Sequence, residues 1–361
     1  MKLLFLAGGA TVTGMEVALL SLMARLNATG HRAVAVVSGW NDGVYPPMLE
    51  AAGIEHHEVF LGRIYRNRPE WSRGTRLAWG DARRDLRAIA ASLRPDWMVL
   101  SEAQSLLFCA VVLPGIKRLL YLHGEPERIM RHPVAGHVIG WSVKRVICVS
   151  DFLADKARRT PLGGLPMAVV HNGTSLPAIE HAVAPGRAVD APVRLGIVGR
   201  ISVQKRHRLL LEALTRLPRD SFRLSIVGSL ADEVGEQVTA LGLGDRVSWA
   251  GFVSDKAEIY RNLDIVVAPA VDEGFGMTVI EAGAHGLPVV AARSGAFPEV
   301  IRDGETGLLV PPDDADALAG ALRRLIDDAS LRQRLGDMAR ARVAADFTVE
   351  RMADRFVAAL A

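Results

Sequence analysis

Short apolar runs that end in glycine, each followed by a helical pattern, open both halves of the chain. Leu3–Ala7 and Leu195–Val198 are two such runs, and apolar residues then recur at helical spacing over Met15–Leu26 and Arg206–Leu217. A buried strand, a glycine turn and a helix form the opening of a Rossmann-like unit. The pattern therefore predicts two units of this kind.

Further apolar runs predict the remaining strands, and helical patterns separate most of them. These runs are Ala33–Val37, Trp97–Leu100, Arg118–Tyr121, Arg145–Val149, Arg223–Val227, Val247–Trp249, Ile265–Ala268 and Pro288–Ala291. Such alternation is typical of parallel sheets covered on both faces. Leu176–Pro192 is rich in alanine and proline, as linkers are. We expect a first domain over residues 1–185 and a second over residues 190–347, with ligands bound at the carboxyl ends of the strands.

Composition narrows the class of protein. The 361 residues are 50% hydrophobic and 23% charged, with a net charge of +3. At roughly 150 residues per domain, this length fits two domains. The small positive excess argues against a dedicated nucleic-acid binder. Cys109 and Cys148 are the two cysteines, which excludes a disulfide scaffold and favours a cytoplasmic protein. No apolar run approaches the ~20 residues of a membrane span.

The strongest candidate site lies in the second half. Gly274 and Gly276 flank a tight turn after a predicted strand, and a helix is predicted to begin near Met277. Its N-terminus offers unpaired N–H donors, which suit a phosphate or a sugar hydroxyl. Glu273 before the turn and Glu281 on the second helical turn are suited to accept hydrogen bonds from hydroxyl groups, such as those of a ribose and a hexose. A glycine turn before a helix with an incidental glutamate is an equally open interpretation.

A second candidate element follows the strand that ends at Gly199. Arg200 comes directly after it, and Lys205 lies five residues further on. Two cations at a strand end can pair with a diphosphate, the arginine through its fork and the lysine as a point charge. A solvated loop explains the same residues, and the residues alone leave both interpretations open.

Together these motifs resemble the family-4 retaining glycosyltransferases of GT-B fold. The resemblance runs through Gly199-Arg200, Lys205, Glu273-Gly274-Phe275-Gly276-Met277, Glu281-Ala282, Gly286–Ala291, Gly295–Glu299 and Asp303–Pro312, in order and spacing. In the first half it is looser, at Thr13-Gly14, His123-Gly124, Val149-Ser150 and Val170–Gly173. It implies an α/β protein with two Rossmann-like domains facing across a deep cleft. It also implies that a C-terminal helix, residues 348–361, crosses back to the first domain.

The resemblance implies a role for each matched residue. Arg200 and Lys205 bind the diphosphate of a nucleoside-diphosphate sugar, and Glu281 binds its ribose. Glu273 accepts from hydroxyls of the donor sugar. The backbone groups near that sugar belong to residues 274–277, which are Gly274, Phe275, Gly276 and Met277.

Other matched positions complete the expected site. Gly251-Phe252-Val253 contacts the nucleobase, His123 hydrogen-bonds the donor sugar, and Thr13-Gly14 forms the acceptor-side loop, with threonine where the family usually has glycine. Ser229-Leu230 and Ala296 also depart from the usual pattern, which leaves the subfamily open. No metal and no other cofactor is expected.

The expected function is transfer of a hexose-type sugar, with retention, to a hydroxyl of a glycan, glycolipid or small-molecule acceptor. A nucleotide-sugar epimerase and a non-catalytic nucleotide-sugar-binding subunit are the alternatives. Between Arg63 and Arg87, eight arginines stand against three acids, with Tyr65, Trp71 and Trp79 among them. Such a segment can dock at the inner face of an anionic membrane or bind a lipid-linked acceptor. A solvated helix with inward aromatics fits equally well.

Overall fold

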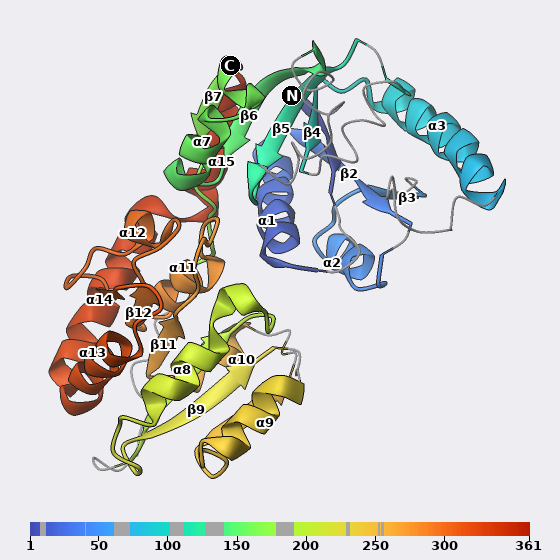
Figure 1. The fold of residues 1–361 in the computed structure, drawn as a ribbon. Helices are drawn as coiled ribbons and strands as arrows, with labels where there is room; N and C mark the ends of the chain where they lie inside the picture. Colours follow the sequence, from blue (N-terminus) through green and yellow to red (C-terminus); the bar gives the residue numbers. More distant parts are fainter. Residues whose placement is uncertain are drawn as a thin grey trace. The chain divides into compact units, whose positions relative to one another are not determined.

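The computed structural model describes residues 1–7, 12–39, 41–60, 73–101, 112–113, 115–126, 141–177, 191–228, 232–251, 253 and 256–361, except for the side chains of 73–79, 232 and 256. The described residues form two units (Figure 1). The first comprises Met1–Gly173 and Val349–Ala361, and the second comprises Thr174–Thr348.

A seven-stranded parallel sheet, in the order β3-β2-β1-β4-β5-β6-β7, forms the centre of the first unit. Its strands are β1 (Lys2–Leu6), β2 (Arg32–Ser38), β3 (His56–Val59), β4 (Trp97–Leu100), β5 (Lys117–Leu122), β6 (Val143–Cys148) and β7 (Met167–Val169). The helices are α1 (Gly14–Ala28), α2 (Tyr45–Ala51), α3 (Arg73–Leu93), α7 (Asp151–Arg158) and α15 (Val349–Leu360). A short 3₁₀ helix covers Pro161–Gly164.

The last helix, α15, belongs to the first unit although it follows the second in sequence. It packs against α1. Both ends of the chain therefore belong to this unit, since β1 begins at Lys2 and α15 ends at Leu360 (Figure 1). Phe356 is fully buried, with its ring 6.1 Å from that of Phe5 and 5.6 Å from that of Tyr121. The C-terminal helix therefore packs on the first sheet through Phe356.

The second unit contains a six-stranded parallel sheet in the order β10-β9-β8-β11-β12-β13. The strands are β8 (Val193–Val198), β9 (Phe222–Val227), β10 (Val247–Gly251), β11 (Ile265–Ala268), β12 (Val289–Ala292) and β13 (Leu308–Val310). The helices are α8 (His207–Leu214), α9 (Asp232–Ala240), α10 (Lys256–Arg261), α11 (Met277–Ala284), α12 (Phe297–Val300), α13 (Ala315–Asp327) and α14 (Ala329–Asp346). A 3₁₀ turn, η2, covers Val203–Lys205.

Both strand orders match the doubly wound arrangement, in which the chain moves outward from a central strand to one edge and then restarts on the other side. This confirms the predicted fold class, two Rossmann-like α/β domains with a returning C-terminal helix. The strands over Trp97–Leu100 and Ile265–Ala268 were predicted to the residue. The structure adds β3, whose four residues include two histidines and a glutamate, and the three-residue strands β7 and β13.

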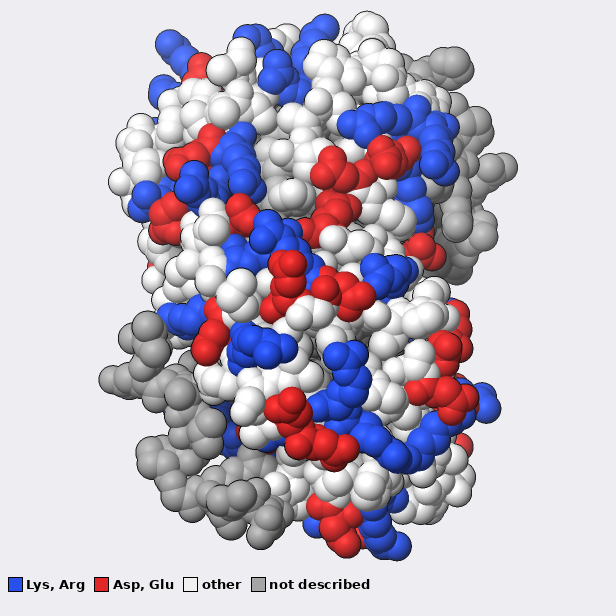
Figure 2. Space-filling model, turned by 90° about the vertical axis from the view of Figure 1, so that its left-hand side faces the viewer, with Lys and Arg blue, Asp and Glu red and all other residues white. Residues whose placement is uncertain are grey.

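Charged side chains of both signs are interspersed across the described part of the face in Figure 2. This mixture agrees with a net charge of only +3. Among the described residues, no helix combines the length and the apolar character that a membrane crossing requires.

Candidate active site

The second sheet reverses its winding between β8 and β11, which are hydrogen-bonded neighbours. Loops that leave such a pair diverge and open a crevice at the carboxyl ends of the strands. Gly199 and Arg200 follow β8, and residues 269–276 follow β11. The sequence motifs of the second half are thus placed at the position where doubly wound sheets bind ligands.

Backbone hydrogen bonds join the ends of β8, β9 and β10. The Gly199 N–H donates to the Val227 carbonyl at 2.9 Å, and the Gly228 N–H donates to the Gly251 carbonyl at 2.8 Å. Gly228 has a φ of +148°, and a Cβ on it would lie 2.2 Å from the Gly199 carbonyl oxygen. Only glycine fits this position, and the loop that carries Arg200 depends on it.

Lys205 and Glu273 form an ion pair at the crevice, with Nζ 2.8 Å from Oε2. Their side chains are 24% and 20% exposed, so ligands in solution can reach both. The lysine side chain passes 3.6 Å from the position of a Cβ on Gly199, close to the end of β8. Arg200 is exposed and has no ion-pair partner among the described residues. The Lys205–Glu273 pair and the exposed Arg200 are therefore carried by the loops that follow β8 and β11.

Gln204 fastens the turn that carries Lys205 to the loop that carries Glu273. The Gln204 side-chain nitrogen donates to the Asp272 backbone carbonyl at 2.9 Å. The backbone carbonyl of Gln204 accepts from the Val271 N–H at 3.0 Å. The Glu273 carbonyl in turn accepts from the Ala296 N–H at 2.9 Å. The alanine found where the family usually has a second glycine therefore keeps the backbone bond that holds this loop.

In the turn before α11, the aromatic side chain of Phe275 is buried. Phe275 is 3% exposed and packs edge-on against Phe347, with ring centroids 6.0 Å apart. Gly276 has a φ of +96°, and a Cβ there would lie 2.7 Å from the Phe297 ring. Helix α11 then begins at Met277, as predicted. Phe275 therefore contributes to a ligand site only through its backbone.

Glu281 lies in the second turn of α11 and is only 8% exposed. The Tyr260 hydroxyl donates to its Oε2 at 2.8 Å. Burial and the neighbouring carboxylate raise the pKa of Tyr260 well above its usual value, so this hydroxyl keeps its proton. Tyr260 is not among the predicted site residues, because nothing in the sequence indicates its contact with Glu281, 21 residues further on.

In the first unit, His123 follows β5 at the carboxyl end of the first sheet. Its ring lies 4.3 Å from that of Tyr121, and both ring nitrogens are buried without a hydrogen-bond partner among the described residues. Burial lowers the pKa of His123 to about 3, so the imidazole is neutral at physiological pH. A neutral ring with two unused nitrogens can donate one hydrogen bond and accept another.

Thr13 and Gly14 form the start of α1. Thr13 caps the helix by accepting from the Met15 N–H at 3.3 Å, and the Glu16 carboxylate accepts from the Thr13 N–H at 2.8 Å. This reciprocal arrangement is a capping box, which satisfies N–H groups at a helix start. The threonine that replaces the family's usual glycine is accounted for by this cap.

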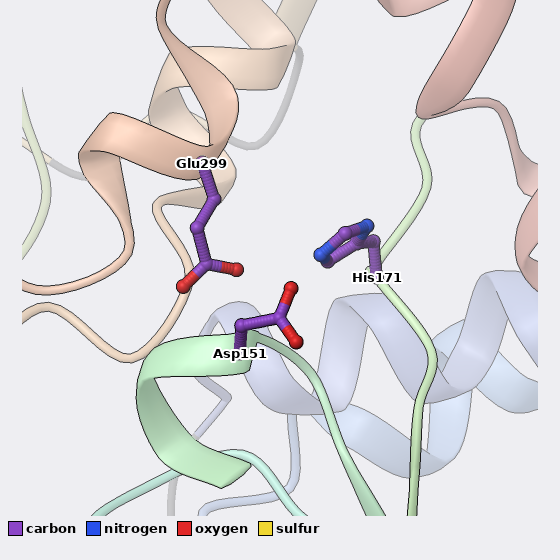
Figure 3. Close-up of side chains that lie close together, drawn as sticks. All are labelled: Asp151, His171 and Glu299. Atoms are coloured by element: carbon purple, nitrogen blue, oxygen red, sulfur yellow. The ribbon is translucent and has the colours of Figure 1, made fainter. Parts of the chain in front are cut away.

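His171 follows β7 and faces Asp151, the first residue of α7 (Figure 3). Ligand-type atoms of the two side chains lie within 4.8 Å of each other. Figure 3 also shows Glu299, which belongs to α12 of the second unit. The sequence analysis did not assign His171 to the site, and the pair is a local feature of the first unit.

Several predicted elements fall outside the described residues. They are Phe252 of the nucleobase loop, Gly8 and Gly9 after the first strand, and residues 63–72 of the arginine-rich segment. Val253 is described and is half-buried.

Comparison with known proteins agrees with this arrangement. The family model described as Glycosyltransferase Family 4 matches residues 12–176, and that of Glycosyl transferases group 1 matches residues 184–342. The lipopolysaccharide core biosynthesis mannosyltransferase LpcC of Rhizobium leguminosarum bv. viciae is 33% identical over 232 residues, covering 59% of this chain and 64% of that protein. LpsB of Rhizobium meliloti, also a lipopolysaccharide core biosynthesis mannosyltransferase, is 30% identical over 238 residues, covering 61% of this chain and 68% of that protein.

A crystal structure of Anabaena Alr3699/HepE in complex with UDP and glucose has a TM-score of 0.82 at 23% identity, covering 100% of this chain and 99% of that one. The sucrose-phosphate synthase of Thermosynechococcus elongatus has a TM-score of 0.80 at 22% identity, covering 99% and 97%. These likenesses show the GT-B fold.

The first two curated relatives are matched over 64% and 50% of their length. The chain belongs to family 4 of the glycosyltransferases, the group 1 type.

Proposed function

We propose that the chain is a retaining glycosyltransferase that moves a hexose from a nucleoside-diphosphate sugar to a hydroxyl of a glycan, glycolipid or small-molecule acceptor. The observation that carries the proposal is the Lys205–Glu273 pair at the switch point of the second sheet. A cation beside a hydrogen-bond acceptor matches a donor in which the phosphate is attached to the anomeric carbon of a sugar and hydroxyls are carried by the neighbouring carbons.

In the proposed donor complex, Lys205 and Arg200 bind the diphosphate, and Glu273, released from Lys205, accepts from hydroxyls of the hexose. Glu281 accepts from the ribose hydroxyls, residues 251–253 contact the base, and the backbone of residues 274–277 contacts the sugar. The two cations stabilise the charge that develops on the leaving diphosphate, an effect that dominates many reactions of this kind. Neutral His123 donates a hydrogen bond to the donor sugar, and Thr13-Gly14 lies on the acceptor side.

Retention follows in this proposal without a protein nucleophile or a metal. The acceptor hydroxyl attacks on the face from which the diphosphate departs, and the leaving phosphate oxygen takes its proton. The bond from the anomeric carbon to the phosphate oxygen breaks as the bond to the acceptor oxygen forms. The names of LpcC and LpsB, both lipopolysaccharide core mannosyltransferases, favour a mannosyl donor and a glycolipid acceptor.

The test is transfer itself. The protein is incubated with UDP-, GDP-, ADP- and dTDP-hexoses and with saccharide and glycolipid acceptors, and the anomeric configuration of the product is read by NMR. The proposal predicts an acceptor-dependent product with the donor's α or β configuration retained. An inverted product contradicts the retaining mechanism, and a product formed without any acceptor supports an epimerase instead. The same assay with EDTA tests independence from metal.

We further propose that the protein acts in the cytoplasm and that residues 63–87 hold it at an anionic membrane. In the part of this segment that the structure describes, the charge of Arg84 is paired with Asp81 at 3.0 Å, whereas Arg87 donates to the neutral Val112 carbonyl at 3.1 Å and keeps its charge. Co-sedimentation with phosphatidylglycerol vesicles but not with phosphatidylcholine vesicles is expected, and equal sedimentation with both contradicts the idea.

A further inference from the structure

Tyr260 and Glu281 form a buried pair that neither donor phosphate nor donor hexose is expected to touch. The tyrosine lies in α10 and is 1% exposed, and its hydroxyl donates to Glu281 Oε2 at 2.8 Å. A hydrogen bond to a carboxylate is about twice as strong as one between neutral groups. The bond therefore fixes the rotation of the Glu281 carboxylate about its own side chain.

His285 packs against the ring of Tyr260. Its ring lies 4.9 Å from that of Tyr260, tilted by 31°. Its Nδ1 lies 2.8 Å from the Glu281 carbonyl oxygen, which can only accept, so Nδ1 carries the proton and the ring is fixed. Tyrosine, histidine and glutamate thus form one rigid arrangement across α10 and α11.

We propose that Tyr260 is a positioning residue that orients Glu281 for the two adjacent hydroxyls of a ribose and so sets the preference for ribonucleotides over deoxyribonucleotides. The inference rests on the proposed function, in which Glu281 binds the ribose. A carboxylate has acceptor positions for about four hydrogen bonds, so one bond from Tyr260 is compatible with two from a ribose. With only 8% of Glu281 exposed, a carboxylate that rotates away cannot be reached in another geometry.

The test measures dissociation constants by calorimetry for UDP, GDP and ADP and for their 2′-deoxy counterparts. The variants are Tyr260→Phe, which keeps the ring and its contact with His285, and Glu281→Ala. Tyr45→Phe is the matched control. Tyr45 is also a buried tyrosine, but it lies in the other unit, where its hydroxyl donates a hydrogen bond to the Glu16 backbone carbonyl at 3.1 Å.

We expect the wild type to bind one ribonucleotide at least about tenfold more tightly than its deoxy form, equivalent to about 1.4 kcal/mol. Tyr260→Phe should reduce this preference to less than about threefold and leave the affinity for the deoxy form nearly unchanged. Tyr45→Phe should keep the wild-type ratio. In the Glu281→Ala background, Tyr260→Phe should have no further effect, because it acts through the glutamate.

Each other outcome has a distinct meaning. If Tyr260→Phe weakens both forms equally and keeps the ratio, the tyrosine only supports packing and the inference is wrong. If it changes the ratio in the Glu281→Ala background as well, it does not act through Glu281, and the inference is again wrong. If the wild type binds both forms of a nucleotide equally, the ribose role of Glu281 fails and the inference with it, but the proposed donor site stands. If the wild type binds none of the nucleotides, the proposed donor site itself fails.

Discussion

Replacing Gly228 with alanine should damage the candidate site without replacing any residue assigned to a ligand. The added Cβ would lie 2.2 Å from the Gly199 carbonyl oxygen, whereas ordinary contacts begin at 3.4 Å. The two backbones must separate by about 1 Å, since neither atom belongs to a flexible side chain. The Gly199 carbonyl is bonded to the nitrogen of Arg200, so the arginine moves with it.

A misplacement of about 1 Å at a catalytic group can lower the rate about 100-fold. We therefore expect kcat/KM of Gly228→Ala to fall by about two orders of magnitude. Overpacking and the positive φ of +148° should also lower the free energy of unfolding, by about 1–3 kcal/mol. Release of the nucleoside diphosphate measures the rate, and urea unfolding measures the stability.

Gly320→Ala is the matched control for Gly228→Ala. Gly320 lies within α13 of the same unit, and a Cβ there meets nothing within 4 Å. Alanine in a helix interior should raise stability by up to about 1 kcal/mol and leave the rate unchanged. Two results would refute the idea that the close approach of Gly228 to Gly199 positions Arg200. One is a wild-type kcat/KM in Gly228→Ala, and the other is an equally large fall of kcat/KM in Gly320→Ala.

Three other substitutions test separate parts of the structure. Lys205→Ala should lower kcat about 100- to 1000-fold but change urea stability by less than about 1 kcal/mol, because the Lys205–Glu273 pair is partly exposed; near-normal turnover contradicts its assignment. His123 has a folded pKa of about 3 against an ordinary 6.5, so the unfolded state binds more protons between these values and stability falls as pH drops from about 6.5. His123→Asn should reduce that fall, by up to about 1.4 kcal/mol per pH unit, in urea titrations at pH 4.5–7; an unchanged slope contradicts the buried neutral ring. Phe356→Ala should cost about 3–5 kcal/mol of unfolding free energy, since its ring fills the space beside Phe5 and Tyr121; a cost below about 1 kcal/mol means that α15 contributes little to the first core.

The apolar pattern predicted the sheets well because parallel strands are buried on both faces and read as continuous apolar runs. Ile265–Ala268 is such a run, and the structure has β11 over the same residues. The pattern failed at His56–Val59, where polar residues form the edge strand β3. Three of the four residues of β3 are not fully buried, so this strand does not require an apolar run.

The site was predictable as a set of motifs but not as a set of contacts. Lys205 and Glu273 were expected near a donor, yet nothing in the sequence indicates that they pair, because 68 residues separate them. Tyr260 was missed for the same reason, since its bond to Glu281 spans 21 residues. The Lys205–Glu273 contact depends on the strand order that places β8 beside β11, and the Tyr260–Glu281 contact depends on where α10 and α11 lie. Both are properties of the tertiary structure.

The central claim is that the second unit binds a nucleoside-diphosphate sugar at the carboxyl ends of β8 and β11. Thermal unfolding of the wild type and of Glu281→Ala, with and without UDP-, GDP-, ADP- and dTDP-hexoses, tests it most directly. A ligand at about 100 times its dissociation constant adds about 2.7 kcal/mol of stability. We predict a clear rise in Tm with one nucleotide series and its loss in Glu281→Ala. No rise with any series, or an equal rise in both proteins, contradicts the claim.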